Sequence, residues 1–208
     1  MSVFKLPNSL CDDLARMIRR FWWGQKDGKN KIAWLSWEKM CAPKEKGGLS
    51  FHDLRAINLA LLTKQGWRLQ INSHSLVHRV VKAWYFPNTN FLHAELGTKP
   101  SYAWRSIFLA QPVLKADYRW QEGDGNDIGI WTERWLPRPS TFRVLSPPAI
   151  LPADTKVSSL IDSDSGEWNV NLINQIFSSD DVTSILGIPL SHHKPRDRLI
   201  WAYTPKGK

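Results

Sequence analysis

The fold of this chain is decided by the stretch FWWGQKDGKNKIAWLSWEKMCAPKEKGGLSFHDLRAINLALLTKQGWR, from Phe21 to Arg68, where tryptophan interleaves with lysine and arginine around one Gly-Gly turn. After the turn, Asp53 is placed to cap a helix that runs from Leu54 to about Leu69. Apolar residues recur there at steps of three and four, which is the period of a helix with one buried side. The stretch therefore predicts a long amphipathic helix with basic residues at its margin.

Helical patterns continue on both sides of this stretch. Leu10 to Phe21 carries its apolar residues on one face, and Asn8 or Ser9 is suited to cap it. Further helices are predicted over Trp37–Cys41, over Ser75–Tyr85, over Tyr102–Lys115 with Ser101 as its cap, and over two short segments near 172–177 and 182–186. Asp12-Asp13 and Asp180-Asp181 fall in first turns, so we interpret them as capping carboxylates rather than metal ligands.

Short strands and a proline-rich segment follow the helices. Tyr118–Gln121 and Asp127–Trp131 flank Gly123-Asp124-Gly125-Asn126, which predicts a hairpin over 118–131. The alternation at Arg198–Tyr203 predicts one more strand, with an unpaired edge. We therefore expect a mainly α fold with a small β-hairpin (α+β), divided into a basic, Trp-rich helical region 1–135, a Pro-rich linker 136–156 and a small acidic α+β segment 157–208.

The positive charge of the chain is concentrated in its first part. Residues 1–120 hold 19 Lys and Arg against 8 Asp and Glu, net +11, whereas residues 121–208 hold 9 against 11, net −2. A basic surface of this kind favours a polyanionic partner, because phosphate binding releases condensed counterions. A well-solvated surface is the other interpretation of the same charges.

The number of cysteines and the absence of long apolar runs indicate the cellular compartment of the protein. Cys11 and Cys41 are the two cysteines, and no CxxC pair, apolar leader or glycosylation sequon occurs. We expect an intracellular protein of the nucleus or cytoplasm, not a secreted one, with both cysteines as small apolar residues; a disulfide between them stays an alternative. We expect no metal, cofactor, membrane or small-molecule substrate, and the sequence does not indicate an oligomeric state.

A series of motifs spans Val3 to Leu136. They are FWWG (21–24), WLSW (34–37), CAPK (41–44), GGLSFHDL (47–54), NLALL (58–62), QGWR (65–68), YFPN (85–88), PSYAWRSI (100–107), WQEGDG (120–125) and IW (130–131). On these motifs the chain resembles the segment that follows the polymerase core in the reverse transcriptases of plant non-LTR (LINE-type) retrotransposons. The resemblance extends more loosely to Lys208.

The resemblance implies a fragment without catalytic groups. Family members carry their catalytic aspartates upstream, in a palm, and a Cys/His zinc-binding domain downstream, and this chain shows neither. Residues from about 8 to 70 look like the helical thumb that holds the template–primer duplex, or its junction with the next region. The chain also has no aromatic-x-Asp-Asp hairpin of the kind that supplies metal-binding carboxylates in polymerases. We therefore expect no enzyme activity and no catalytic residue.

The expected partner is RNA or DNA, including an RNA–DNA hybrid, bound through its backbone. The candidate phosphate contacts are Arg16, Arg19, Arg20, Lys26, Lys29, Lys31, Lys44, Lys46, Arg55, Lys64 and Arg68. The candidate base-stacking residues are Trp22, Trp23, Trp34 and Trp37. Packing of a small core is the alternative for these four, and it is the expected role of Trp104, Trp120, Trp131 and Trp135.

Three functional hypotheses remain open on the sequence. The first is a non-catalytic retrotransposon fragment with weak, sequence-independent affinity for nucleic acid. The second is a structural connector that orients neighbouring domains and binds no nucleic acid, and the third is a retroelement remnant without a function. Salt separates the first from the others, because phosphate binding weakens steeply between roughly 50 and 200 mM salt.

Overall fold

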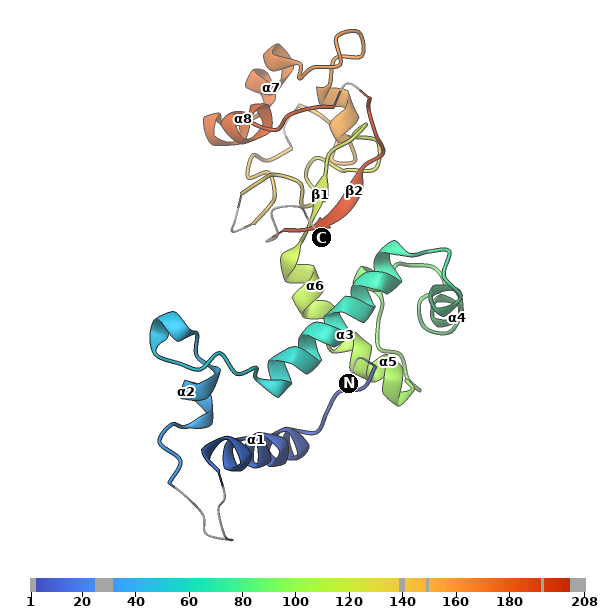
Figure 1. The fold of residues 1–208 in the computed structure, drawn as a ribbon. Coiled ribbons are helices and arrows are strands. Elements are labelled where there is room, and N and C mark those ends of the chain that lie inside the picture. The colour runs from blue at the N-terminus through green and yellow to red at the C-terminus, as the bar shows by residue number, and fades with distance from the viewer. Residues whose placement is uncertain (1–2, 25–31, 139–140, 149, 192, 203–208) are drawn as a thin grey trace. The chain divides into compact units, whose positions relative to one another are not determined.

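Helices supply most of the secondary structure and a two-stranded antiparallel sheet supplies the rest, which confirms the predicted fold class. The structure is a computed structural model that describes residues 3–24, 32–138, 141–148, 150–191 and 193–202. The chain divides into unit 1, Met1–Lys115, and unit 2, Ala116–Lys208 (Figure 1). This division falls ahead of the Pro-rich segment 136–156, whose residues belong to unit 2.

The regular secondary structure of unit 1, within its described residues, consists of helices joined by loops. Its elements are α1 (Asn8–Trp23), α2 (Trp37–Cys41), the short 3-10 helix η1 (Lys44–Lys46), α3 (Leu54–Ile71), α4 (Leu76–Tyr85), η2 (Phe91–His93), α5 (Tyr102–Phe108) and α6 (Gln111–Asp117), the last of which reaches into unit 2. Unit 2 contains β1 (Tyr118–Gln121), η3 (Val157–Leu160), α7 (Val170–Ile176), α8 (Ser179–Leu186) and β2 (Arg198–Trp201).

Local capping signals determine where several helices begin. Asp53 accepts a hydrogen bond from the Arg55 amide at 2.8 Å and starts α3, as predicted. Ser75 and Ser101 cap α4 and α5 in the same way. The predicted cap of α1 by Asn8 or Ser9 is wrong, since the helix starts at Asn8 after Pro7 and has no side-chain cap.

The predicted helix Tyr102–Lys115 is two helices, α5 and α6. Pro112 is the second residue of α6, and it has no backbone N–H to donate to a carbonyl of the preceding turn. Proline is tolerated in the first turn of a helix but not in its interior, so the continuous pattern is broken at Leu109–Ala110.

The core of unit 1 lies where α3, α4, η2 and α5 meet. Trp104 is 2% exposed and stacks on Tyr85, with ring centroids 4.7 Å apart and planes 3° apart. Gly66 of α3 lies against this core, because a Cβ there would come within 2.7 Å of both Phe91 and Leu114. The glycine of the QGWR motif is therefore explained by close packing of α3 on its neighbours.

The segment ahead of α1 is attached to α3 and α5. The buried Asn58 side chain accepts from the Leu6 amide and donates to the Phe4 carbonyl, both at 2.9 Å. Tyr102 donates its hydroxyl to the Lys5 carbonyl at 2.8 Å and stacks on Phe4. These contacts fix the point at which α1 leaves the rest of unit 1.

The hairpin predicted over 118–131 is wrong in its pairing. β1 pairs antiparallel with β2, so that Tyr118 faces Trp201 and Gln121 faces Arg198, and the predicted strand at Arg198 has a partner. The reason is Asp197, whose carboxylate accepts from the amides of Gly123, Gly125 and Asp127 at 2.7 to 2.9 Å. The glycine loop therefore wraps around a distant carboxylate instead of closing a tight turn.

Unit 2 has one continuous apolar core. Its buried members are Ile128, Ile130, Trp135, Leu136, Val144, Val157, Leu160, Ile173, Ile176, Phe177, Ile185 and Ile188. Trp120 and Trp131 pack against this core, and Trp135 is fully buried within it. Trp104 is buried in the core of unit 1, so the core role predicted for these four tryptophans is confirmed.

Asp181 is a buried polar centre in unit 2 rather than the predicted cap of its helix. Its carboxylate accepts from the Leu145 and Ser146 amides and from the Ser146 hydroxyl, and it forms an ion pair with Arg138 at 3.1 Å. Burial raises the pKa of Asp181, but these hydrogen bonds and the Arg138 charge outweigh burial and leave the pKa lowered.

Candidate nucleic-acid interface

The segment after α2 folds back on that helix and places an aromatic ring between two tryptophans. The Leu49 and Phe51 amides both donate to the Met40 carbonyl, at 3.1 and 2.9 Å. Gly48 permits this return, because a Cβ there would lie 1.9 Å from the Ala42 carbonyl oxygen. Phe51 then contacts Trp22 and Trp37 edge-on, with centroids 5.0 and 6.0 Å away. The GGLSF motif thus builds an aromatic cluster against the end of α1.

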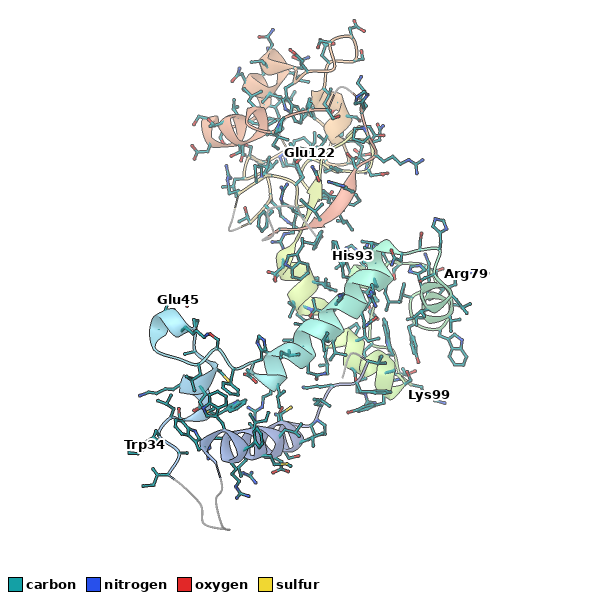
Figure 2. All side chains as sticks on the ribbon, in the orientation of Figure 1. Trp34, Glu45, Arg79, His93, Lys99 and Glu122 are labelled. Carbon is teal, nitrogen blue, oxygen red and sulfur yellow. The ribbon has the colours of Figure 1, made fainter. Side chains whose placement is uncertain are left out.

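Large aromatic side chains around this cluster face solvent. Phe21 is 87% exposed, Trp34 is 76% exposed and Trp22 is 53% exposed, whereas Trp23 and Trp37 are half-buried. Figure 2 shows Trp34 beside α1 and α2, on the segment that leads into α2. The packing alternative therefore does not account for Trp22 and Trp34. We call the cluster Phe21, Trp22, Trp34, Trp37 and Phe51 the aromatic end.

Two predicted phosphate contacts are already paired with carboxylates. Arg16 contacts Asp13 at 3.0 Å one turn away on α1, and Arg55 of α3 pairs with Asp12 of α1. The Arg55 pair joins residues 43 positions apart, so no local pattern could predict it. Exposed pairs such as these contribute little to stability, but they reduce the charge offered to a phosphate.

The positive charge of Arg19 on α1 acts on Glu38 of α2. The pKa of Glu38 is lowered, first by a backbone hydrogen bond and by the Ser36 hydroxyl, and also by the Arg19 charge. Arg19 is half-buried, whereas the next residue, Arg20, is exposed and directly precedes Phe21. Arg20 is therefore the described cation that adjoins the aromatic end most directly in sequence.

Lys44, Lys46, Lys64 and Arg68 are exposed and have no ion pair among the residues that the structure describes. Lys44 and Lys46 lie on η1, just before the Gly-Gly turn. Lys64 and Arg68 are four residues apart on α3 and share one face of that helix. Nine residues separate Arg55 from Lys64, about two and a half turns, so these two point to opposite sides of α3. The structure thus divides the predicted cations among several surfaces.

Three further candidates, Lys26, Lys29 and Lys31, lie outside the described residues. Their sequence positions connect the end of α1 with the segment that carries Trp34.

A groove of about 430 Å³ lies between α1, α2 and the start of α3. Cys11, Ala15, Trp37, Cys41, Ala42 and Leu54 line it together with Asp12, Glu38, Asp53 and Arg55. Three carboxylates against one guanidinium make this groove unsuited to a phosphate. The sequence-based prediction did not separate this acidic groove from the basic surfaces beside it.

Both cysteines line that groove as free thiols. Cys11 is buried and Cys41 is half-buried, as expected for small apolar residues. Burial raises the pKa of Cys41, and the nearby charges of Asp53 and Glu38 raise it further, so the thiol is not activated. Within the described ranges, no group of three His, Cys, Asp or Glu side chains is placed to hold a metal ion. Nor does that part of the chain contain a helix of the length and apolarity needed to cross a bilayer.

Comparisons with known proteins give two relatives from Arabidopsis thaliana. An uncharacterized mitochondrial protein is 40% identical over 137 residues, which are 65% of this chain and 89% of the relative. A protein named "Putative ribonuclease H protein" is 29% identical over 212 residues, with all of this chain matched to 34% of the relative. The chain thus spans about a third of that longer relative. No protein-family model matches the chain, and no solved structure matches it.

Proposed function

This chain belongs to the same family as the uncharacterized mitochondrial protein of Arabidopsis thaliana, and on that premise we propose that it is a non-catalytic, retroelement-derived segment that binds nucleic acid. Within that proposal, unit 1 corresponds to the part of a LINE-type reverse transcriptase that follows the polymerase core. It binds the sugar–phosphate backbone without reading sequence.

The longer relative supports the retroelement origin. Its name is that of a ribonuclease H, an enzyme class whose substrate is a nucleic acid, and this chain matches a third of it. Reverse transcription produces RNA–DNA hybrids, so a ribonuclease H and a reverse-transcriptase-derived segment would meet the same kind of duplex. The sequence motifs from FWWG (21–24) to IW (130–131) support the non-LTR assignment.

The observation that carries the binding proposal is the aromatic end with its neighbouring cations. A soluble surface rarely exposes tryptophan and phenylalanine to the extent of Trp34 and Phe21 without a use for them. Stacking of one base on an exposed aromatic ring is worth about 1–3 kcal/mol. Arg20, which directly precedes Phe21 in the chain, and Lys44 and Lys46 on η1 supply the positive charge that a backbone needs.

The absence of catalysis is part of the proposal. The two Asp-Asp pairs of the chain are engaged elsewhere: Asp12 and Asp13 pair with arginines, and Asp181 is buried in the core of unit 2. A two-metal polymerase centre needs carboxylates that converge on the metal ions. Template-dependent, metal-dependent nucleotide incorporation by the purified chain would contradict this part of the proposal.

The test is binding of the full chain to a fluorescein-labelled RNA–DNA hybrid and to the matching single strand, followed by anisotropy between about 50 and 200 mM salt. We expect affinity to fall by at least about tenfold over this range. We expect Lys44→Glu/Lys46→Glu to weaken binding at all sequences and to reduce the slope of log K against log salt by about 2. Trp34→Ala should weaken binding of the single strand more than that of the hybrid, because unpaired bases are free to stack.

Lys99→Glu is the matched control for the charge reversals. Lys99 is exposed in the same unit, and Figure 2 shows it near α5, away from Trp34. It should leave the salt slope nearly unchanged. A folded chain that binds neither probe at low salt would favour the connector hypothesis instead.

A further inference from the structure

One face of helix α4 packs against the rest of unit 1. His78 is buried, and its Nδ1 lies 2.6 Å from the Leu69 carbonyl oxygen of α3. The same ring meets Phe86 edge-on, with centroids 6.0 Å apart. Tyr85 at the end of α4 stacks on the buried Trp104. These contacts determine which side of α4 faces the unit and which side faces away from it.

The outward face of α4 is apolar. Leu76 is 72% exposed, Val77 is 64%, Val80 is 51% and Trp84 is 78%. The four residues fall within about 100° on a helix, so they form one continuous stripe, called here the α4 face. A stripe of this kind normally packs against another element. In unit 1 it is left open.

The charged side chains of α4 and of α3 before it are all of one sign. No Asp or Glu occurs between Leu54 and Ala94, whereas Arg79 and Lys82 belong to α4 itself. Figure 2 shows Arg79 on α4 at the margin of the unit. A complementary partner therefore presents acidic groups at the edge of an apolar surface.

The chemistry of the stripe distinguishes between classes of partner. Leu76, Val77 and Val80 are aliphatic and offer no π-face to a base, unlike the aromatic end. α4 has ten residues, about 15 Å, and two cations, which is short and weakly charged for a helix that lies in a lipid interface. A second copy of the α4 face would bring Arg79 and Lys82 against their own equivalents, where like charges repel.

We propose that the α4 face is a docking site for an amphipathic helix of another protein, with acidic residues flanking its apolar stripe. Trp84 is the anchor of the interaction, because a large exposed aromatic residue in an apolar patch is the usual centre of such interfaces. Arg79 and Lys82 pair with the acidic flanks and set the orientation. The docking site is separate from the aromatic end and does not depend on nucleic-acid binding.

The test uses the full chain and two synthetic helical peptides of about 20 residues. Both carry the same leucine stripe, and one has glutamates on its flanks where the other has lysines. We expect the acidic peptide to bind at least about tenfold more tightly than the basic one in fluorescence anisotropy. Trp84→Ala should weaken the acidic peptide about tenfold or more, and Arg79→Glu/Lys82→Glu should remove the preference for it.

Met17→Ala is the matched control, since Met17 is 63% exposed on α1 and also apolar. Met17→Ala should leave peptide binding unchanged. Because all of these variants alter exposed or half-buried side chains, circular dichroism should show that each keeps an intact fold. Equal binding of both peptides, no binding of either, or no effect of Trp84→Ala would overturn the proposal. So would displacement of the peptide by single-stranded RNA, or Trp84-dependent binding of phosphatidylcholine–phosphatidylserine vesicles, which would identify a nucleic-acid face or a membrane surface instead.

Discussion

The two units of this chain use tryptophan in opposite ways. In unit 2 the indole N–H groups of four tryptophans donate hydrogen bonds inside the fold, from Trp120 to Glu133, from Trp131 to the Ser146 carbonyl, from Trp135 to the Ile130 carbonyl and from Trp168 to the Ile188 carbonyl. In unit 1, Trp104 is bonded in this way, whereas Trp22, Trp34 and Trp84 are exposed and the buried Nε1 of Trp23 has no partner in the described residues. Unit 2 thus buries much of its tryptophan area, whereas unit 1 leaves the side chains of Trp22, Trp34 and Trp84 exposed.

The distribution of charge follows the same division. Residues 1–115 hold 18 Lys and Arg against 7 Asp and Glu, net +11, and residues 116–208 hold 10 against 12, net −2. A tryptophan-rich composition alone does not distinguish a core from a binding surface. The distinction comes from whether the indole N–H finds a carbonyl or carboxylate within the fold, and from the sign of the charge around it.

Replacing one tryptophan in each unit gives the strongest test of this comparison. Trp135→Ala should destabilise unit 2 by about 4 kcal/mol, because it empties a fully buried site and leaves the Ile130 carbonyl unpaired. Trp34→Ala in unit 1 should change the free energy of unfolding by less than about 0.5 kcal/mol. Urea unfolding combined with hydrogen exchange resolved by unit measures both. Similar losses in the two variants would break the comparison.

Removing the carboxylate that closes unit 2 should have the next largest effect. Asp197→Ala leaves the amides of Gly123, Gly125 and Asp127 without their acceptor, at a cost of about 3 kcal/mol. Hydrogen exchange should accelerate in β1 and β2 and stay unchanged in α3. Asp124→Ala is the control in the same loop, since Asp124 accepts a longer bond, 3.3 Å, from the Asn126 amide. An equal loss in both variants would mean that the loop needs no central acceptor.

Glu122 is a buried carboxylate of unit 2 whose ionisation makes the unit sensitive to pH. Burial raises the pKa of Glu122 to about 7, with a further contribution from the Asp197 charge, and one buried carboxylate oxygen has no hydrogen-bond donor in the described residues. Because the folded pKa lies above the unfolded value of about 4.3, ionisation favours unfolding. Stability contributed by the neutral form is present below about pH 4 and is lost as pH rises to about 7.

Glu122→Gln should therefore stabilise unit 2 by about 2 kcal/mol at pH 8 and change it little at pH 4. Urea unfolding at several pH values measures the difference. The exposed Glu167 provides the control, because Glu167→Gln removes the same charge from a solvated position. Equal unfolding free energies for wild type and Glu122→Gln across this pH range would show that the Glu122 carboxylate is not destabilised by its surroundings.

The smallest expected effect lies at Gly66, where α3 packs on Phe91 and Leu114. Gly66→Ala should cost about 1 kcal/mol, because the clash of its Cβ with Phe91 and Leu114 outweighs the gain in helix propensity. Ala56→Gly at an exposed position of the same helix measures that propensity separately. Stabilisation by Gly66→Ala would mean that Phe91 and Leu114 shift easily to accept the added methyl group. The two units would then differ in the rigidity of their cores as well as in the exposure of their tryptophans.

Local signals allowed much of the helical fold to be predicted. The caps at Asp53, Ser75 and Ser101 are each formed within three residues, so the sequence beside the helix contains the needed information. The partner of β1 depends on Asp197, more than 70 residues from the Gly123 loop, and local turn composition favoured the wrong pairing. The role of Asp181 was missed for the same reason, since Arg138 and Ser146 lie far from it along the chain.

The candidate interface was predictable in composition but not in arrangement. Basic and aromatic residues could be identified from Phe21 to Arg68, and the exposure of Trp34 and Arg20 agrees with a binding role. Pairing of Arg55 with Asp12 could not be foreseen, because helical periodicity does not state which helices meet. The helix over Ser75–Tyr85 was predicted, but the exposure of the α4 face was not, since a helical pattern does not reveal whether a neighbour is present to cover its apolar side.

The pairing of Tyr118 with Trp201 also sets an order of events during synthesis of the chain. The helices of unit 1 pack on neighbours that have already been made by the time Lys115 leaves the ribosome. β1 must wait for 76 further residues, 122–197, before its partner strand is made, and closing a loop of that length is slow. Throughout that interval β1 lacks its partner strand and the amides of the Gly123 loop lack the Asp197 carboxylate. Unit 2 is therefore the part of the nascent chain most prone to misassociation.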